Sequence, residues 1–270
     1  MVTRIISGVI GLPVLIAIVL FGGIALKIGI LIASLVGMYE FYKAFSKKFV
    51  TTHLIGYGFA LFYIIFINEI INISNYFNIF VSIFVVTVLV YTVVFHNHTN
   101  ALEGMITFFG FFYVCFLISH VYLIREYQYG SLFIWLAFIS AWGCDTGAYF
   151  TGVTIGKHKL IPTLSPKKTI EGSLGGIVTA GIIAFVYGCI IKRYVALENM
   201  NIVLLCVLTG VAGSILSQIG DLAASAIKRY TGIKDFGNLI PGHGGILDRF
   251  DSVLLTAPVV YYIMLFLVAV

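Results

Sequence analysis

The sequence predicts an all-α integral membrane protein that crosses the bilayer about nine times. Of its 270 residues, 60% are hydrophobic and only 10% are charged, whereas about a quarter of the residues in a soluble domain are charged. The mean hydropathy is +1.07. Apolar runs of about 20 residues are long enough to cross the hydrocarbon core as helices. The alternating polarity expected of a membrane β-barrel is absent from the sequence.

Apolar runs between polar breaks define the expected helices. They cover residues 5–22, 24–41, 54–71, 77–95, 105–124, 131–150, 174–191, 202–220 and 252–270. The first run follows Arg4 in the manner of a signal peptide, but no small-residue cleavage site comes after it. We therefore expect it to stay attached as a membrane helix.

The distribution of Lys and Arg predicts the orientation, because basic residues near helix ends are retained on the cytoplasmic side. With the N-terminus in the cytoplasm, 12 of the 16 Lys and Arg residues fall inside and four fall outside. The two long polar loops, at about 151–173 and 221–251, then both face the cytoplasm. The net charge of +5 suits work beside anionic lipid headgroups or phosphates, although ordinary basic cytoplasmic loops also account for it.

One face of the helix that starts near residue 202 is expected to be polar. Its polar residues recur every three or four positions, so a helix continued through residue 228 lines them up; they are Ser214, Ser217, Asp221, Ser225 and Lys228. A seam of small residues for helix packing explains the serines but not the carboxylate of Asp221. We expect this helix to leave the membrane with one wet face.

Two further carboxylates, Asp248 and Asp251, are spaced to project from one side of a helix that begins near Leu247. Together with Asp221 they form an oxygen-only set without Cys or His partners. Such a set suits Mg²⁺ better than Zn²⁺. The alternative is that Arg249 and nearby lysines simply neutralise these carboxylates.

Asp145 and the basic loop after it form a second polar region. A carboxylate inside a membrane helix costs roughly 2.5–3.5 kcal/mol, which favours a functional role in a polar cavity; pairing with a loop lysine at the interface is the alternative. The loop offers hydroxyl, ammonium and backbone N–H groups that suit a phosphate, although an ordinary positive-inside loop also fits. Its polar side chains include Ser165, Lys167, Lys168, Thr169 and Glu171.

The remaining Cys and His residues have weaker implications. The four cysteines lie in apolar segments and are interpreted as packing residues. His96 and His98 are interpreted as part of a solvated loop. His243 lies in a glycine-rich turn at 241–245, where it is expected either to contact phosphate, to support a metal ligand or to be only structural.

The polar island at residues 225–251 resembles the signature motif of the phosphatidate cytidylyltransferase family, also called CDP-diacylglycerol synthases. Its defined positions are Ser225, Ile227, Lys228, Arg229, Lys234, Asp235, Gly237, Ile240, Pro241, His243, Gly244, Gly245, Ile246, Asp248, Arg249, Phe250 and Asp251. The segments at 145–149 and 165–172 also resemble parts of the family. The resemblance therefore covers roughly residues 140–255.

This resemblance implies transfer of CMP from CTP to phosphatidate, giving CDP-diacylglycerol and pyrophosphate. It implies a Mg²⁺-dependent enzyme that allows a second cation such as K⁺, works as a homodimer in the lipid bilayer and has no nucleic-acid partner. It places the active site on the cytoplasmic side of a bacterial inner membrane. Residues 1–130 are then expected to form a scaffold that offers dimer contacts, and residues 131–270 a catalytic region.

The hypothesis assigns the charged residues to three roles. Asp221, Asp248 and Asp251 hold the metal and, with Lys228, are the catalytic residues. Asp145 and Glu171 support them or supply further cation ligands. The residues expected to bind substrate phosphates are Ser165, Lys167, Lys168, Thr169, Arg229, Lys234, His243 and Arg249.

Two other classes of function, another lipid-modifying enzyme and a transporter, stay open from the residues alone. A CTP-dependent lipid kinase or a CDP-archaeol type synthase needs similar acidic and basic loops. A transporter uses intramembrane carboxylates such as Asp145, but it predicts a site near mid-membrane and an inverted repeat. No convincing repeat is visible in the sequence.

Overall fold

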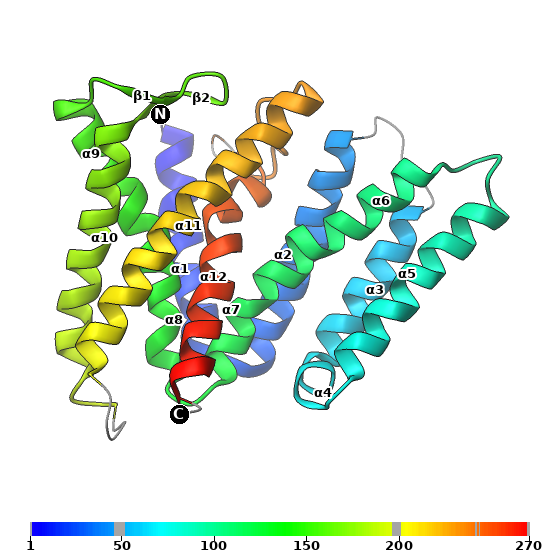
Figure 1. Ribbon diagram of the computed structural model, residues 1–270, viewed down its shortest axis with the longest axis horizontal. Coiled ribbons are helices and arrows are strands. Elements are labelled where there is room, and N and C mark those ends of the chain that lie inside the picture. Colours follow the sequence, from blue (N-terminus) through cyan, green and yellow to red (C-terminus); the bar gives the residue numbers. More distant parts are fainter. Residues whose placement is uncertain (1, 46–51, 196–200, 241, 243, 269–270) are drawn as a thin grey trace.

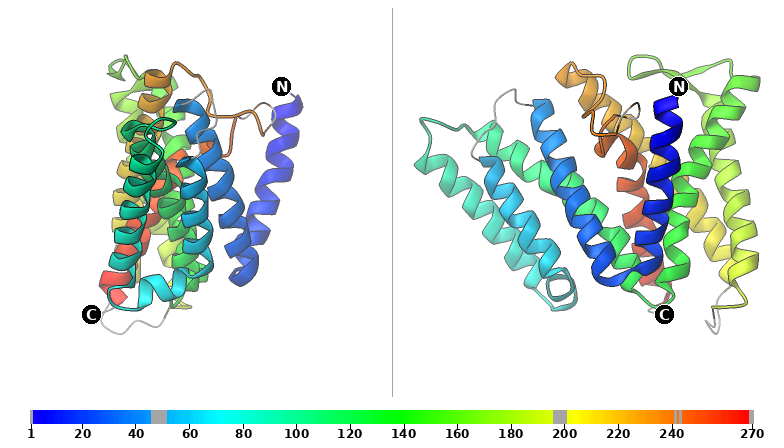
Figure 2. Two further views of the ribbon diagram at one scale, coloured as in Figure 1. Left: turned by 90° about the vertical axis from the view of Figure 1, so that its right-hand side faces the viewer. Right: turned by 180° about the vertical axis from the view of Figure 1, so that it is seen from behind.

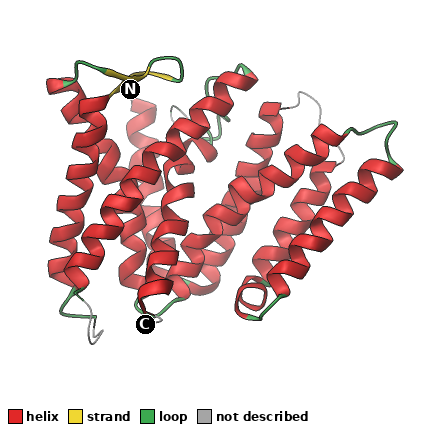
Figure 3. Ribbon diagram, in the orientation of Figure 1, coloured by secondary structure: helices red, strands yellow, loops and turns green. Residues whose placement is uncertain are grey.

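The computed structural model describes residues 2–45, 52–195, 201–240, 242 and 244–268, which form a bundle of helices with one short β-hairpin (Figures 1 and 3). The expected all-α membrane class is confirmed. The helices are α1 (Val2–Phe21), α2 (Gly23–Phe45), α3 (Thr52–Ile65), α4 (Ile67–Asn72), α5 (Tyr76–Val94), α6 (Ala101–Gly110), α7 (Leu117–Glu126), α8 (Gly130–Phe138), α9 (Cys144–Ile155), α10 (Ile170–Ile191), α11 (Ile202–Thr231) and α12 (Leu247–Val268). Two π-helical turns, η1 (Phe111–Phe116) and η2 (Ile139–Gly143), join α6 to α7 and α8 to α9.

Within the described residues, seven helical segments are long and apolar enough to cross a membrane. They are Gly23–Phe45, Tyr76–Val94, Ala101–Glu126, Gly130–Ile155, Ile170–Ile191, Ile202–Thr231 and Leu247–Phe266. The expected spans at 5–22 and 54–71 correspond to shorter apolar helices, Gly11–Phe21 and Thr52–Ile65. The total of nine crossings therefore stays a prediction.

Both polar connections of the C-terminal half lie at one end of the bundle (Figure 1). The hairpin and the segment between α11 and α12 share this end with the start of α1, whereas α12 finishes at the opposite end (Figures 1 and 2). This arrangement agrees with loops that face the same compartment as the N-terminus. Which compartment that is stays a prediction.

Small residues let the C-terminal helices pack closely. In lipid, association of helices depends on close packing, because their apolar side chains gain nothing by leaving the hydrocarbon. A Cβ atom at Gly176 of α10 would lie only 2.7 Å from the carbonyl oxygen of Cys144, at the start of α9. One at Gly188 would lie 3.0 Å from Cβ of Cys206 on α11. These close approaches hold α10 against α9 and α11. The ends of these three helices therefore lie together at the polar end of the bundle.

The loop expected at 151–173 is mostly regular structure. Helix α9 continues to Ile155 and α10 begins at Ile170. Between them, β1 (Lys159–Ile161) pairs antiparallel with β2 (Ser165–Thr169), Lys159 opposite Thr169 and Ile161 opposite Ser165. The sequence predicted a polar loop here but not this hairpin, because strands of three and five residues are too short to show a periodic pattern.

The connections between α5 and α6 and between α7 and α8 lie at opposite ends of the bundle (Figure 1), which allows a test of topology. Asn97 and Gln128 are exposed in these two connections, so each is replaced by Cys in a background whose four native cysteines are changed to Ala. A membrane-impermeant maleimide should label Gln128→Cys on intact cells, and Asn97→Cys only after permeabilisation. Labelling in the reverse order would contradict the predicted orientation.

Candidate active site

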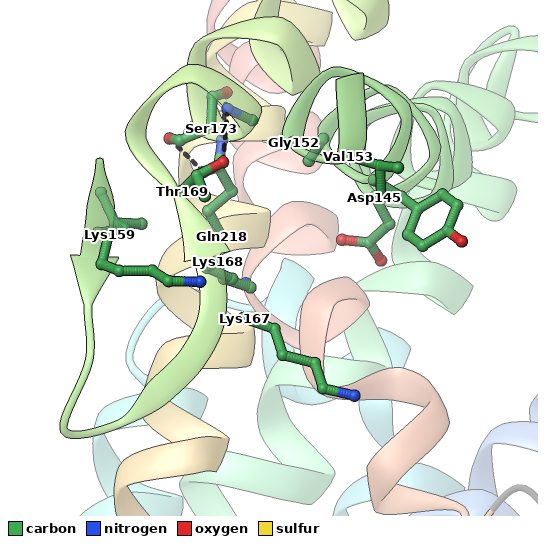
Figure 4. A pocket seen from close by; sticks show the side chains of 13 residues that line it. Asp145, Gly152, Val153, Lys159, Lys167, Lys168, Thr169, Ser173 and Gln218 are labelled. Carbon is green, nitrogen blue, oxygen red and sulfur yellow. Dashed lines mark hydrogen bonds between the residues drawn. The ribbon is translucent and has the colours of Figure 1, made fainter. Parts of the chain in front are cut away.

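A cavity of about 440 Å³ opens between α9, the hairpin and α10 (Figure 4). Asp145 lines it from α9, while Lys159, Lys167 and Lys168 line it from the two strands. Gln218 of α11 lies at its inner side. The cavity therefore places an acid opposite several ammonium groups, which suits a ligand that carries both phosphates and a cation.

Asp145 of α9, Asp221 of α11 and Asp251 of α12 are three carboxylates from different helices at this end of the bundle. A Cβ atom at Gly220 would lie 2.6 Å from the carbonyl oxygen of Asp251, so α11 crosses α12 at close range here. Asp221 follows Gly220, and its charge acts on both Asp145 and Asp251. The acids predicted on α9, α11 and α12 thus act on one another.

Basic side chains are interleaved with these carboxylates. Lys168 of β2 forms a direct ion pair with Asp221. Lys168 and Arg249 both act electrostatically on Asp145, and Lys228 acts on Asp251. Because unpaired charges are costly in a low-dielectric setting, this alternation lets the carboxylates gather at a membrane helix end.

Asp248 has a different environment from the other acids. Its Oδ1 accepts a hydrogen bond from Nζ of Lys228 at 3.0 Å, and its Oδ2 accepts from the N–H groups of Phe236 at 2.8 Å and Gly245 at 3.0 Å. Its side chain is only 3% exposed. Both oxygens therefore hold the α11–α12 connection in shape. Lys228, expected to be catalytic, is the cation of this buried pair.

The three acids expected to hold a metal are not gathered as one ready ligand set. Throughout the described part of the chain, no group of three or more His, Cys, Asp or Glu residues is placed to hold a metal ion. The assignment of Asp221, Asp248 and Asp251 to a metal stays a prediction.

Thr169 and Glu171 shape the junction between the hairpin and α10. Oγ1 of Thr169 caps α10 by accepting from the N–H of Gly172 at 3.1 Å. Glu171 accepts from the N–H of Lys157 at 3.1 Å and of His158 at 3.2 Å, and its Oε1 lies 2.6 Å from Nδ1 of His158. These contacts tie the start of the hairpin to the start of α10.

The other residues expected to bind substrate are dispersed. Ser165 is half-buried in β2, while Arg229, Lys234 and Arg249 are exposed near the ends of α11 and α12. Pro241 and His243 lie outside the described residues.

Comparison with known proteins identifies the family. Residues 2–267 match the model of the Cytidylyltransferase family. The chain is 34% identical to the phosphatidate cytidylyltransferase of Staphylococcus epidermidis over 268 residues, 98% of this chain and 99% of that protein. The chain belongs to the cytidylyltransferase family. This confirms the resemblance seen in residues 225–251.

Two further relatives of this cytidylyltransferase carry the same name. The phosphatidate cytidylyltransferase of Staphylococcus aureus (strain COL) is 32% identical over 268 residues, which cover 98% of this chain and 99% of that protein. That of Bacillus subtilis (strain 168) is 42% identical over 137 residues, which cover 51% of this chain and 49% of that protein.

Sequence reasoning missed several polar residues of this cytidylyltransferase. Lys159 lines the cavity beside the predicted lysines. Ser173 donates to Oε1 of Gln218 at 2.5 Å, and Nε2 of Gln218 donates to the carbonyl oxygen of Ser173 at 3.2 Å. An amide next to the polar face of a membrane helix was a signal that could have identified Gln218. Glu40, a buried acid of α2, also contacts Ile246 and Leu247 at the start of α12.

The capping role of Thr169 predicts that two substitutions at this position differ in their effect on the stability of this cytidylyltransferase. Thr169→Val keeps the shape but removes the hydroxyl, and it should lower the free energy of unfolding by about 1 kcal/mol, the usual cost of losing an N-cap. Thr169→Ser keeps the cap and should be close to wild type in thermal unfolding in detergent. A stable Thr169→Val protein whose only defect is a raised KM for CTP would contradict this role.

Proposed function

We propose that this cytidylyltransferase transfers CMP from CTP to phosphatidate, releasing pyrophosphate and forming CDP-diacylglycerol. Its relatives named phosphatidate cytidylyltransferase, two of them matched over nearly their whole length, support this assignment. The observation that carries it is the ion pair of Lys168 and Asp221, which joins the basic hairpin to the carboxylates of the helix ends. It brings phosphate-binding and cation-binding chemistry together at one end of a membrane bundle.

The reaction needs positioning and charge neutralisation more than a strong base. An oxygen of the ionised phosphatidate phosphate attacks the α-phosphorus of CTP and forms a new P–O bond. The bond from the α-phosphorus to the bridging oxygen breaks, and its electron pair leaves with pyrophosphate. Both reactants are anions, so cationic groups that hold them in line supply much of the rate enhancement.

The lysines of the hairpin are the proposed phosphate-binding groups. Lys159 and Lys167 are exposed along the cavity and free to meet a phosphate, whereas Lys168 is half-buried against Asp221. Arg249 is exposed close enough to act on Asp145. Thr169 contributes by holding the hairpin strand on α10, because its hydroxyl is used as the helix cap.

The residues present fit a hard divalent cation such as Mg²⁺ in part. Asp221 and Asp251 act electrostatically on each other where α11 crosses α12, and the buried hydroxyls of Ser217 and Tyr113 have no hydrogen-bond partner among the described residues. Asp248 fits less well, because its two oxygens already accept three hydrogen bonds.

We therefore assign Asp221 and Asp251 as the proposed metal ligands, with Asp145 nearby and Asp248 as a positioning residue. When bound, Mg²⁺ would neutralise charge on the reacting phosphates and on the leaving pyrophosphate. A second cation such as K⁺ stays a prediction without assigned residues. So do the homodimer and the position of the site on the cytoplasmic side of a bacterial inner membrane.

An activity assay tests the proposal directly. Purified protein is incubated with CTP, phosphatidate and Mg²⁺, and both pyrophosphate and the liponucleotide are measured. Asp221→Asn and Asp251→Asn should lower kcat by about 10²-fold or more, the scale for removing one group that stabilises transition-state charge. Thermal unfolding in detergent should stay close to wild type.

The matched control for this assay is Glu126→Gln, the same carboxylate-to-amide change at an exposed site near the end of α7. It should retain nearly full activity, as should His98→Ala in the exposed connection between α5 and α6. Near-normal turnover of Asp221→Asn or Asp251→Asn would rule out the metal assignment. Failure of the wild-type protein to form the liponucleotide would reject the function itself.

A further inference from the structure

Glu40 is a buried acid of α2, in the N-terminal half of the chain. It contacts residues of the signature motif at 225–251. Only 4% of the residue is exposed. Its Oε1 accepts from the N–H of Ile246 at 3.1 Å, and its Oε2 accepts from the N–H of Leu247 at 2.8 Å, across 206 and 207 positions of sequence. The first N–H groups of a helix lack intrahelical partners, and a negative charge is favourable there. Glu40 thus caps the start of α12.

Two glycines of the signature segment face the same carboxylate. A Cβ atom at Gly237 or at Gly245 would overlap Oε1 of Glu40. At both positions the three nearest atoms to such a Cβ all belong to Glu40. Neither glycine has a positive φ, so close approach, and not backbone conformation, accounts for glycine here.

The start of α12 is therefore held between two carboxylates. The N–H of Gly245 donates to Asp248, while the N–H groups of Ile246 and Leu247 donate to Glu40. Because α12 begins at Leu247, these bonds fix the helix origin and with it the position of Asp251, one turn later.

We propose that Glu40 is a positioning residue for the transfer reaction, which sets the origin of α12 so that Asp251 meets Asp221. The proposal rests on the proposed function of these two acids. It gives α2, part of the expected scaffold, a role in the reaction. It also explains why Gly237 and Gly245 of the signature motif are glycines, because both approach Glu40, which lies outside that motif. Glu40 itself does not touch the reacting groups.

A double-mutant cycle between Glu40 and Gly245 tests this role. In the wild-type background, Gly245→Ala should lower kcat/KM for CTP by about 10²-fold, the scale for a misplacement of about 1 Å in an active site. In the Glu40→Ala background the space is vacated, so adding Gly245→Ala should change kcat/KM by less than about three-fold, a strong departure from additivity.

Glu40→Ala alone should lower kcat/KM by about ten-fold or more, because two buried N–H groups lose their acceptor. Glu40→Gln should recover part of this loss, since one amide oxygen still accepts. Gly237→Ala with and without Glu40→Ala repeats the cycle at a second glycine if Gly245→Ala does not fold.

Glu103→Ala is the matched control. Glu103 also caps a helix of the N-terminal half, accepting from the N–H of Asn100 at 3.3 Å at the start of α6. Its loss should leave kcat/KM within about two-fold of wild type, as for an ordinary surface change. Equal losses in the Glu103→Ala and Glu40→Ala proteins, or additive effects in the cycles, would overturn the proposal.

The outcomes also separate this proposal from the proposed function. Full activity of Asp251→Asn would reject the role of Asp251 whatever the cycles show, and the positioning of Asp251 by Glu40 would fall with it. Additive cycles combined with an inactive Asp251→Asn would reject the role of Glu40 alone.

Discussion

The buried carboxylate of Asp248 holds the polar end of this membrane bundle together. It joins three parts of the chain: Lys228 near the end of α11, Phe236 in the connecting segment and Gly245 just before α12. Among its described residues, 232–240, 242 and 244–246, the connecting segment has little regular structure beyond the isolated bridge of Ile240 and Gly244. Without Asp248, an ammonium and two buried N–H groups would lose their acceptor, at about 1–3 kcal/mol for each. Asp248 thus helps to fix the relative position of α11 and α12, together with Glu40 at the start of α12.

The membrane explains why acids and bases alternate around it. Charges at helix ends cannot rely on water alone, so each carboxylate is near an ammonium or guanidinium group. The same alternation is useful for a transfer between two anionic substrates. In the proposed reaction, the exposed ammonium groups of Lys159 and Lys167 meet the substrate phosphates, and Asp221 and Asp251 would hold the cation.

Hydropathy and spacing predicted much of the framework. The continuation of α11 past residue 228 and the start of α12 at Leu247 are confirmed, because the 3.6-residue period and the apolar runs are local properties. The cap at Thr169 also had a local signal, a Thr directly before an apolar helix, although we interpreted it as a phosphate contact. The hairpin was too short to show a period.

The contacts of Asp248 and Glu40 were not predictable in the same way. Asp248 and Asp251 share a helix face by spacing, but long-range hydrogen bonds use the oxygens of Asp248 and leave Asp251 beside Asp221. Glu40 lies in a span that looks like an ordinary apolar helix, and its partners are more than 200 residues away. In both cases tertiary packing, and not local pattern, decides the role of the side chain.

Asp221 and Asp251, from two different helices, are proposed to form one cation site. Electron paramagnetic resonance of Mn²⁺ added to the purified protein, as a probe for Mg²⁺, tests it most directly. We predict a bound Mn²⁺ signal that excess Mg²⁺ displaces and that is lost in both Asp221→Asn and Asp251→Asn. An unchanged bound signal in either variant would contradict a shared cation site of Asp221 and Asp251.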